Sequence, residues 1–120
     1  MAFTGDEGEM IDPALGQKWI DNYRNKVKSD PKAIFGEFYG FRKIEELVGQ
    51  TGAVGIRIYY AIDDTGTQRM ILVGTDANQN DIAPIAGSKG QGLVLDVGFQ
   101  CPPKCNGPCG EERGRNPAKR

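Results

Sequence analysis

Residues 53–62 read AVGIRIYYAI, and residues 68–75 read QRMILVGT. In the first segment apolar side chains alternate at a period of two, and β-branched residues are frequent, which predicts a strand. The intervening DDTGT contains a glycine that can take a positive φ and therefore predicts a turn. The second segment is apolar on both faces, so we expect a return strand near 67–76 that is covered on both sides. An antiparallel hairpin is thus the predicted centre of the fold.

Two helices are predicted before this hairpin. The dipeptide Asp12-Pro13 is typical of a helix start, with an N-cap side chain followed by proline at the first helical position. An apolar stripe follows at four-residue spacing: Leu15, Trp19, Tyr23 and Val27. This spacing predicts a helix near 12–28. A second apolar face predicts a short helix near 42–49, and consists of Phe41, Ile44, Leu47 and Val48.

These elements predict an α+β fold, with N-terminal helices packed on a small antiparallel sheet. The helices are expected to pack Leu15, Trp19, Tyr23, Ile44 and Leu47 on Val54, Ile56, Ile58, Ile71 and Val73. Trp19 is the expected core anchor of the first helix. Residues 32–40 fit either a short helix or a strand, and residues 93–99 fit a third strand. The expected organisation is a flexible arm (1–10), one domain (11–100) and an irregular tail rich in cysteine, proline and glycine (101–120).

The length and charge of the chain exclude several classes. A chain of 120 residues has room for one domain, and 15 basic against 16 acidic residues argue against a nucleic-acid binder. Histidine is absent, which removes histidine-dependent triads and zinc sites with histidine ligands. The N-terminal residues lack the features of a secretion signal, and no apolar run approaches the roughly 20 residues of a membrane span. We therefore expect a cytoplasmic protein that does not bind membranes.

Two motifs suggest a family. The strand segment Gly55-Ile56-Arg57-Ile58-Tyr59 and the tail segment Cys101-Pro102-Pro103-Lys104-Cys105 together resemble a family of small bacterial proteins. Its members share a helical first half, a Gly-x-Arg-x-Tyr strand and a Cys-Pro-Pro-x-Cys tail, and the resemblance covers roughly residues 11–105. The family brings no activity, cofactor or catalytic residue with it. Cys109 lies outside the shared pattern.

The three cysteines form the sharpest chemical motif. Cys101, Cys105 and Cys109 follow one another at four-residue intervals, and each gap fits the Cys-x2–4-Cys pair of a zinc site. A closed zinc site needs a fourth ligand, which here would be Asp96, Glu111, Glu112, water or a neighbouring chain. Redox pairing and a passive tail with no special role are the alternatives. No cofactor is expected other than this zinc ion.

Two loops match binding motifs only in part. Asp76, Asn78 and Asn80 fit the opening of an EF-hand, but the later calcium-ligand positions do not match, so a simple turn is the better interpretation. The segment GSKGQG (87–92) has the lysine before its second glycine, where a phosphate-binding loop would have it after that glycine. An ordinary loop is therefore expected.

No constellation of residues predicts catalysis, so we expect a protein that is not an enzyme. A sheet of two or three strands leaves unpaired edges, which can add a strand from another chain. Arg57 and Tyr59 share one face of the best strand, and both residue types are favoured in interfaces. The leading hypothesis is a non-catalytic interaction or self-assembly module, with homo-oligomers as its simplest form. The alternative is a small metal- or redox-responsive protein that uses the cysteine tail.

Overall fold

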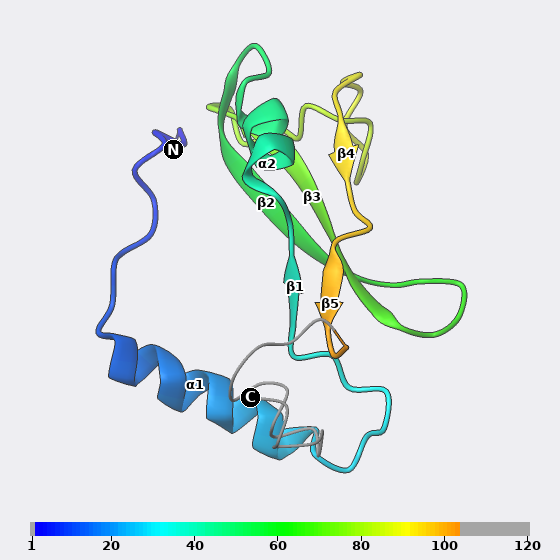
Figure 1. Cartoon of the computed structure of the whole chain (residues 1–120). Coiled ribbons are helices and arrows are strands. Elements are labelled where there is room, and N and C mark those ends of the chain that lie inside the picture. The colour runs from blue at the N-terminus through cyan, green and yellow to red at the C-terminus, as the bar shows by residue number, and fades with distance from the viewer. Residues whose placement is uncertain (1, 104–120) are drawn as a thin grey trace.

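The chain forms two helices and two small antiparallel sheets, as predicted for an α+β protein. We describe residues 2–103 of a computed structural model (Figure 1). The helices are α1 (Pro13–Lys26) and α2 (Phe41–Val48). The strands are β1 (Gly36–Phe38), β2 (Ala53–Ile62), β3 (Gln68–Asp76), β4 (Val94–Leu95) and β5 (Phe99–Cys101). One sheet has the order β2-β3-β4, and β1 and β5 pair to form the second sheet.

The hairpin of β2 and β3 is the longest paired unit and confirms the expected boundaries to within a residue. Ile56 lies opposite Gly74, Ile58 opposite Leu72 and Tyr60 opposite Met70. The turn is closed by Asp63, whose carboxylate accepts hydrogen bonds from the backbone N–H groups of Thr65 and Thr67. The centre of β3 is buried, because α2 packs on it and the loop after β3 contacts it through Asp81 and Thr75. Local alternation and turn chemistry are sufficient to specify this unit.

Helix α2 packs on the sheet and supplies most of the helical contribution to the core. Leu47 is fully buried, and the helix contacts β2, β3 and β4. Gly74 of β3 lies so close to the helix end that an added Cβ would stand 3.1 Å from the Leu47 carbonyl oxygen. The side chain of Gln50 then links the end of α2 to the chain before β4, because it accepts a hydrogen bond from the Leu93 N–H. The predicted packing of Leu47 is thus confirmed.

Helix α1 begins as predicted but does not pack as predicted. Asp12 caps it and Pro13 is its first residue. The expectation that Trp19 anchors the core is wrong, because this side chain is 55% exposed. Leu15 and Tyr23 are 36% and 38% exposed, and the helix lies to one side of both sheets (Figure 1). Its hydrogen bond to the hairpin is at its C-terminal end, where the Tyr23 hydroxyl donates to Gln68 Oε1 at 3.2 Å.

The small sheet resolves the ambiguity of residues 32–40 in favour of a strand. A buried charged network ties it to the long hairpin: Glu37 of β1 contacts Arg69 of β3 at 3.0 Å, and Arg69 also contacts Asp96 at 3.3 Å. The Glu37 side chain is only 2% exposed. Tyr39 donates to the Met70 carbonyl oxygen, and burial, followed by its hydrogen bond to Glu37, raises the pKa of Tyr39 well above its ordinary value. One guanidinium thus lies against two carboxylates, and its contact with Glu37 joins the two sheets.

Candidate functional site

The two residues predicted to form an interface, Arg57 and Tyr59, share a partner within the chain. The Arg57 Nη1 atom lies 2.7 Å from Asp81 Oδ1, and the Tyr59 hydroxyl donates to Asp81 Oδ2. Thr75 of β3 adds a hydrogen bond to the same carboxylate. The Asp81 side chain is 3% exposed, so this cluster holds the loop after β3 against the face of β2. The hydrogen bond between Arg57 and Tyr59, and then the negative charge of Asp81, raise the pKa of Arg57 and keep this side chain cationic.

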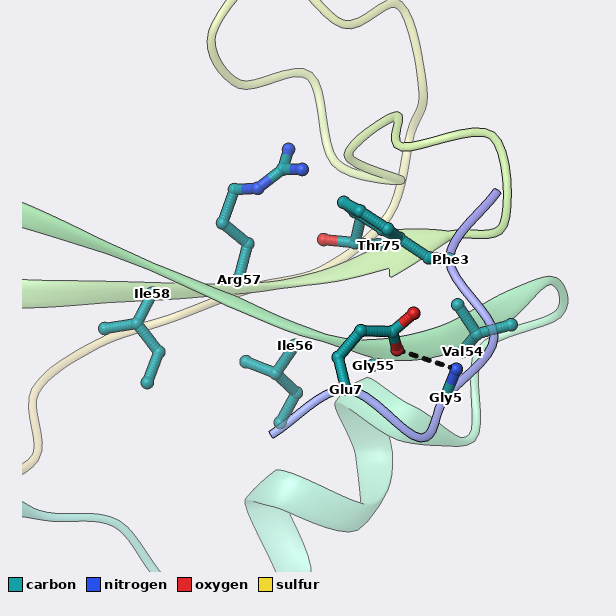
Figure 2. Close-up of a pocket in the computed structure, with 9 residues that line it drawn as sticks. All are labelled: Phe3, Gly5, Glu7, Val54, Gly55, Ile56, Arg57, Ile58 and Thr75. Carbon is teal, nitrogen blue, oxygen red and sulfur yellow. Dashed lines mark hydrogen bonds between the residues drawn. The ribbon is translucent and has the colours of Figure 1, made fainter. Parts of the chain in front are cut away.

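The segment before α1 lies along the first half of β2. The Phe3 N–H donates to the Ala77 carbonyl oxygen at 2.9 Å, and the Phe3 ring stands 5.7 Å from the Arg57 guanidinium. Glu7 accepts hydrogen bonds from Thr4 and Gly5, which lower the pKa of its carboxyl group. Figure 2 shows the resulting cavity, about 500 Å³ in volume, between this segment and residues 54–58. The N-terminal segment therefore covers the first half of β2.

The second half of β2, residues 58–62, is uncovered. In the part of the chain that the structure describes, β2 pairs along one edge only, with β3. Tyr60 is 82% exposed, Ile62 is 76% exposed and Ile58 is 49% exposed. These three side chains lie on one face, because side chains alternate along a strand. We call residues 58–62, with their unpaired backbone edge and this apolar face, the open edge of β2.

The open edge lacks the features that normally prevent strand-to-strand association. Natural edge strands are blunted by charged side chains, proline or bulges. The sequence of residues 58–62 is IYYAI, which contains neither a charge nor a proline. The one irregularity of β2 lies at its other end, between Ala53 and Gly55. The edge is therefore chemically suited to accept another strand.

The open edge adjoins a second cavity, about 670 Å³ in volume, between the end of α1 and the end of the hairpin. Its lining combines two charged residues, Asp30 and Lys32, with mainly apolar ones that include Tyr23, Val27, Ala33, Tyr60 and Ile62. Two acidic residues, Asp63 and Asp64, follow directly in the turn. The open edge thus combines an unpaired backbone, an apolar face and an acidic end.

The remaining motifs from the sequence occupy different places. Asp76 accepts hydrogen bonds from the N–H groups of Asn78 and Asn80, as in a simple turn. The segment 87–92 is a loop in which Gly90 packs against the Ile82 backbone. Cys101 lies at the end of β5 and is disulfide-bonded. Cys105 and Cys109, the other two cysteines of the predicted metal site, lie outside the described residues.

Two further properties of residues 2–103 concern metals and membranes. No group of three or more potential metal ligands gathers within this range. Neither described helix is long and apolar enough to cross a bilayer.

Comparison with known proteins finds no protein-family model, curated protein or solved structure that matches the chain. The resemblance inferred from the two sequence motifs therefore has no match to support it.

Sequence patterns indicated part of this site. They identified β2 and the possibility of an unpaired edge, but they placed Ile58 in the core and selected Arg57 and Tyr59 as the contact residues. The exposed residues Tyr60 and Ile62 were missed, because alternation assigns them to the same apolar face as Ile56. The signal that points to them is the absence of any charge between Arg57 and Asp63.

Proposed function

We propose that the protein is a non-catalytic module that self-associates through the open edge of β2. The observation that carries this proposal is a ten-residue strand that is paired on one edge and ends in an exposed IYYAI segment. Adding a strand satisfies the unpaired backbone groups of both chains and buries apolar side chains from each. A second copy is the simplest partner, since most soluble oligomers are symmetric homo-oligomers.

The strand sequence suits a two-fold antiparallel pairing centred on Tyr60. In that register Tyr60 lies opposite Tyr60 of the second copy, and Ile58 lies opposite its Ile62. Aromatic pairs and β-branched pairs directly opposite each other each contribute roughly 0.2–1 kcal/mol. The pairing joins two hairpins into one continuous sheet and removes the exposed edge from both copies. No catalytic step, nucleic acid or membrane is part of the proposal, and a cytoplasmic location is kept as an expectation from the sequence.

The experiment is sedimentation velocity of the full chain over a wide concentration range. We expect reversible dimerisation that is weakened strongly by Tyr60→Lys, because the symmetry places two like charges opposite each other. Asn78→Lys adds the same charge at an exposed turn and should leave the association unchanged.

The register gives a stricter test. Ile58→Lys and Ile62→Glu should each weaken the dimer, and the double variant should recover it, because each lysine then faces a glutamate of the other copy. A wild-type chain that stays monomeric at high concentration contradicts self-association. A double variant that remains as weak as the single variants contradicts the antiparallel register.

A further inference from the structure

Helix α1 carries an apolar surface that its own chain leaves uncovered. Leu15, Trp19 and Ile20 are 36%, 55% and 50% exposed. Leu15 and Trp19 lie one turn apart on the apolar stripe, and Ile20 lies at its edge, one turn before Tyr23. Helices with an apolar stripe normally bury it against another layer of the same core. Here the hydrogen bond between Tyr23 and Gln68 holds the C-terminal end of the helix near the hairpin, and the first half of α1 extends away from both sheets (Figure 1).

The open edge of β2 presents the complementary surface. Its apolar side chains Ile58 and Tyr60 lie directly opposite Leu72 and Met70 of β3, and with Ile62 they are 49–82% exposed. The C-terminal end of the chain's own α1 adjoins this face only through Tyr23 and Val27, among the described residues that line the cavity. The adjoining cavity of about 670 Å³ is the space that such a layer would occupy. A helical stripe and a sheet face that normally cover each other are therefore both exposed in one chain.

We infer that α1 of one copy packs across the open edge face of a second copy, and that the exchange is reciprocal. This inference rests on the proposed self-association and specifies its second contact surface. Two-fold symmetry makes the contact self-complementary, because each copy supplies one helix and receives one helix.

The area of the two surfaces is sufficient for a stable dimer. Trp19 and Tyr60, at 55% and 82% exposure, have roughly 80–200 Å² each to bury, given about 150–250 Å² for a whole aromatic side chain. The four aliphatic side chains are smaller, so full burial of all six gives a mean of roughly 100 Å² each. The two reciprocal contacts together then bury on the order of 1,200 Å², which reaches the lower end of the range of about 1,200–2,000 Å² for stable interfaces. Backbone pairing along β2 adds further contact.

The charges around the two surfaces are also complementary. The exposed charged residues of helix α1 are Lys18, Lys26 and Asp21, since Arg24 is buried over the Phe35 ring. The turn beside Ile62 carries Asp63 and Asp64. A basic helix laid against the acidic end of the open edge gains favourable electrostatic steering.

Trp19 is the only tryptophan of the chain, so its fluorescence reports directly on this contact. We expect the emission of the wild-type chain to shift to shorter wavelength as concentration rises, with the same midpoint as dimerisation measured by sedimentation. Ile20→Asp should weaken the dimer roughly ten- to one-hundred-fold by charging the apolar stripe. Asn22→Asp adds the same charge at an exposed polar position two residues away and should leave the dimer unchanged.

The other outcomes separate this inference from the proposed function. A monomer at every concentration overturns both. A dimer that resists Ile20→Asp, with unchanged Trp19 emission on association, leaves edge pairing intact and overturns the helix exchange. A short emission wavelength already present in the monomer shows α1 docked on its own sheet, which also overturns the exchange. The last measurement adds phosphatidylserine vesicles. If the Trp19 emission shifts only in the presence of vesicles and without dimerisation, the helix binds a lipid surface and the exchange is overturned.

Discussion

Arg57 in the middle of β2 and Asp81 in the loop after β3 form an ion pair with an N–O distance of 2.7 Å. The two residues come from different structural units, so the pair fixes the loop on the face of the hairpin. Tyr59 and Thr75 donate to the same carboxylate, which leaves the buried charge fully partnered by three side chains.

Removal of the cation should therefore destabilise the domain. Arg57→Ala leaves the Asp81 carboxylate buried without its counter-charge, and loss of one partner of a buried pair costs about 3–5 kcal/mol. Because Arg57 is partly exposed, we expect a loss near the lower end, about 3 kcal/mol, in the free energy of unfolding. Urea denaturation measures it. A loss below about 1 kcal/mol, the usual range of surface pairs, would show that the pair is a surface contact.

The Glu37–Arg69 contact makes a second prediction about the junction of the two sheets. Arg69→Met keeps the apolar stem but removes the charge that pairs with a carboxylate that is 2% exposed. We expect a loss of about 3 kcal/mol and faster hydrogen exchange in β1 and β5. Lys43→Met is the matched control, because Lys43 and its partner Glu46 are both exposed, and should change stability by less than about 1 kcal/mol. Equal effects of the two substitutions would contradict a bridging role for Arg69.

The hairpin turn should give the protein a specific sensitivity to acid. The Thr65 hydroxyl and then the Thr67 N–H stabilise the charged form of Asp63 and lower the pKa of this carboxyl group below its ordinary value of 3.8. A lowered acid pKa contributes stability that is fully present above the ordinary value and is lost as pH falls through the lower, folded value. Asp63→Asn removes the titrating carboxyl group. The variant should therefore lose less stability than the wild-type chain below about pH 4.

Thermal unfolding followed from pH 6 to pH 2 tests the turn. Asp64→Asn is the control, because the described turn directs its hydrogen bonds to Asp63. The wild-type chain and the Asp64→Asn variant should lose stability in parallel over this range, and Asp63→Asn should lose less. If the stability of all three proteins falls in parallel with pH, the hydrogen bonds to Asp63 do not lower its pKa in the folded chain relative to the unfolded chain.

Gly90 should be intolerant of any side chain. An added Cβ would stand 1.7 Å from the Ile82 carbonyl oxygen, a backbone atom that cannot move aside without displacing the loop. Gly90→Ala is expected to destabilise the domain by more than about 2 kcal/mol, as is usual for overpacking of a rigid site. Gly55→Ala is the control, since a Cβ there meets nothing within 4 Å, and it should be neutral or slightly stabilising. Similar stability of the two variants in urea would contradict the close approach.

The sequence predicted those parts of the fold that depend on neighbours along the chain. The hairpin follows from alternation and turn residues, and α1 begins at Asp12-Pro13 as expected because capping is local. The strands β1 and β5 could not be predicted with the same ease, because each has three residues and is defined by a partner far along the chain. The helical period of α1 correctly indicated an apolar stripe, but a period does not reveal what covers that stripe.

The candidate site was less predictable for the same reason. The partner of Arg57 and Tyr59 lies 22–24 residues away in the sequence, so their role within the chain is invisible to local patterns. Tyr60 and Ile62 look like core residues by alternation, and only the tertiary structure shows that the covering layer ends before them.

The pairing of β1 with β5 has a consequence for the order in which the protein folds and opens. Glu37 and Gln100 belong to these strands and are 63 residues apart in the sequence, so closing the loop between them costs on the order of 4 kcal/mol of chain entropy. Three residue pairs and the Arg69 contact offset this cost only after the hairpin has formed and shortened the loop. We therefore expect the small sheet to assemble last and to open first, so that its amides exchange with solvent before those of residues 72–75.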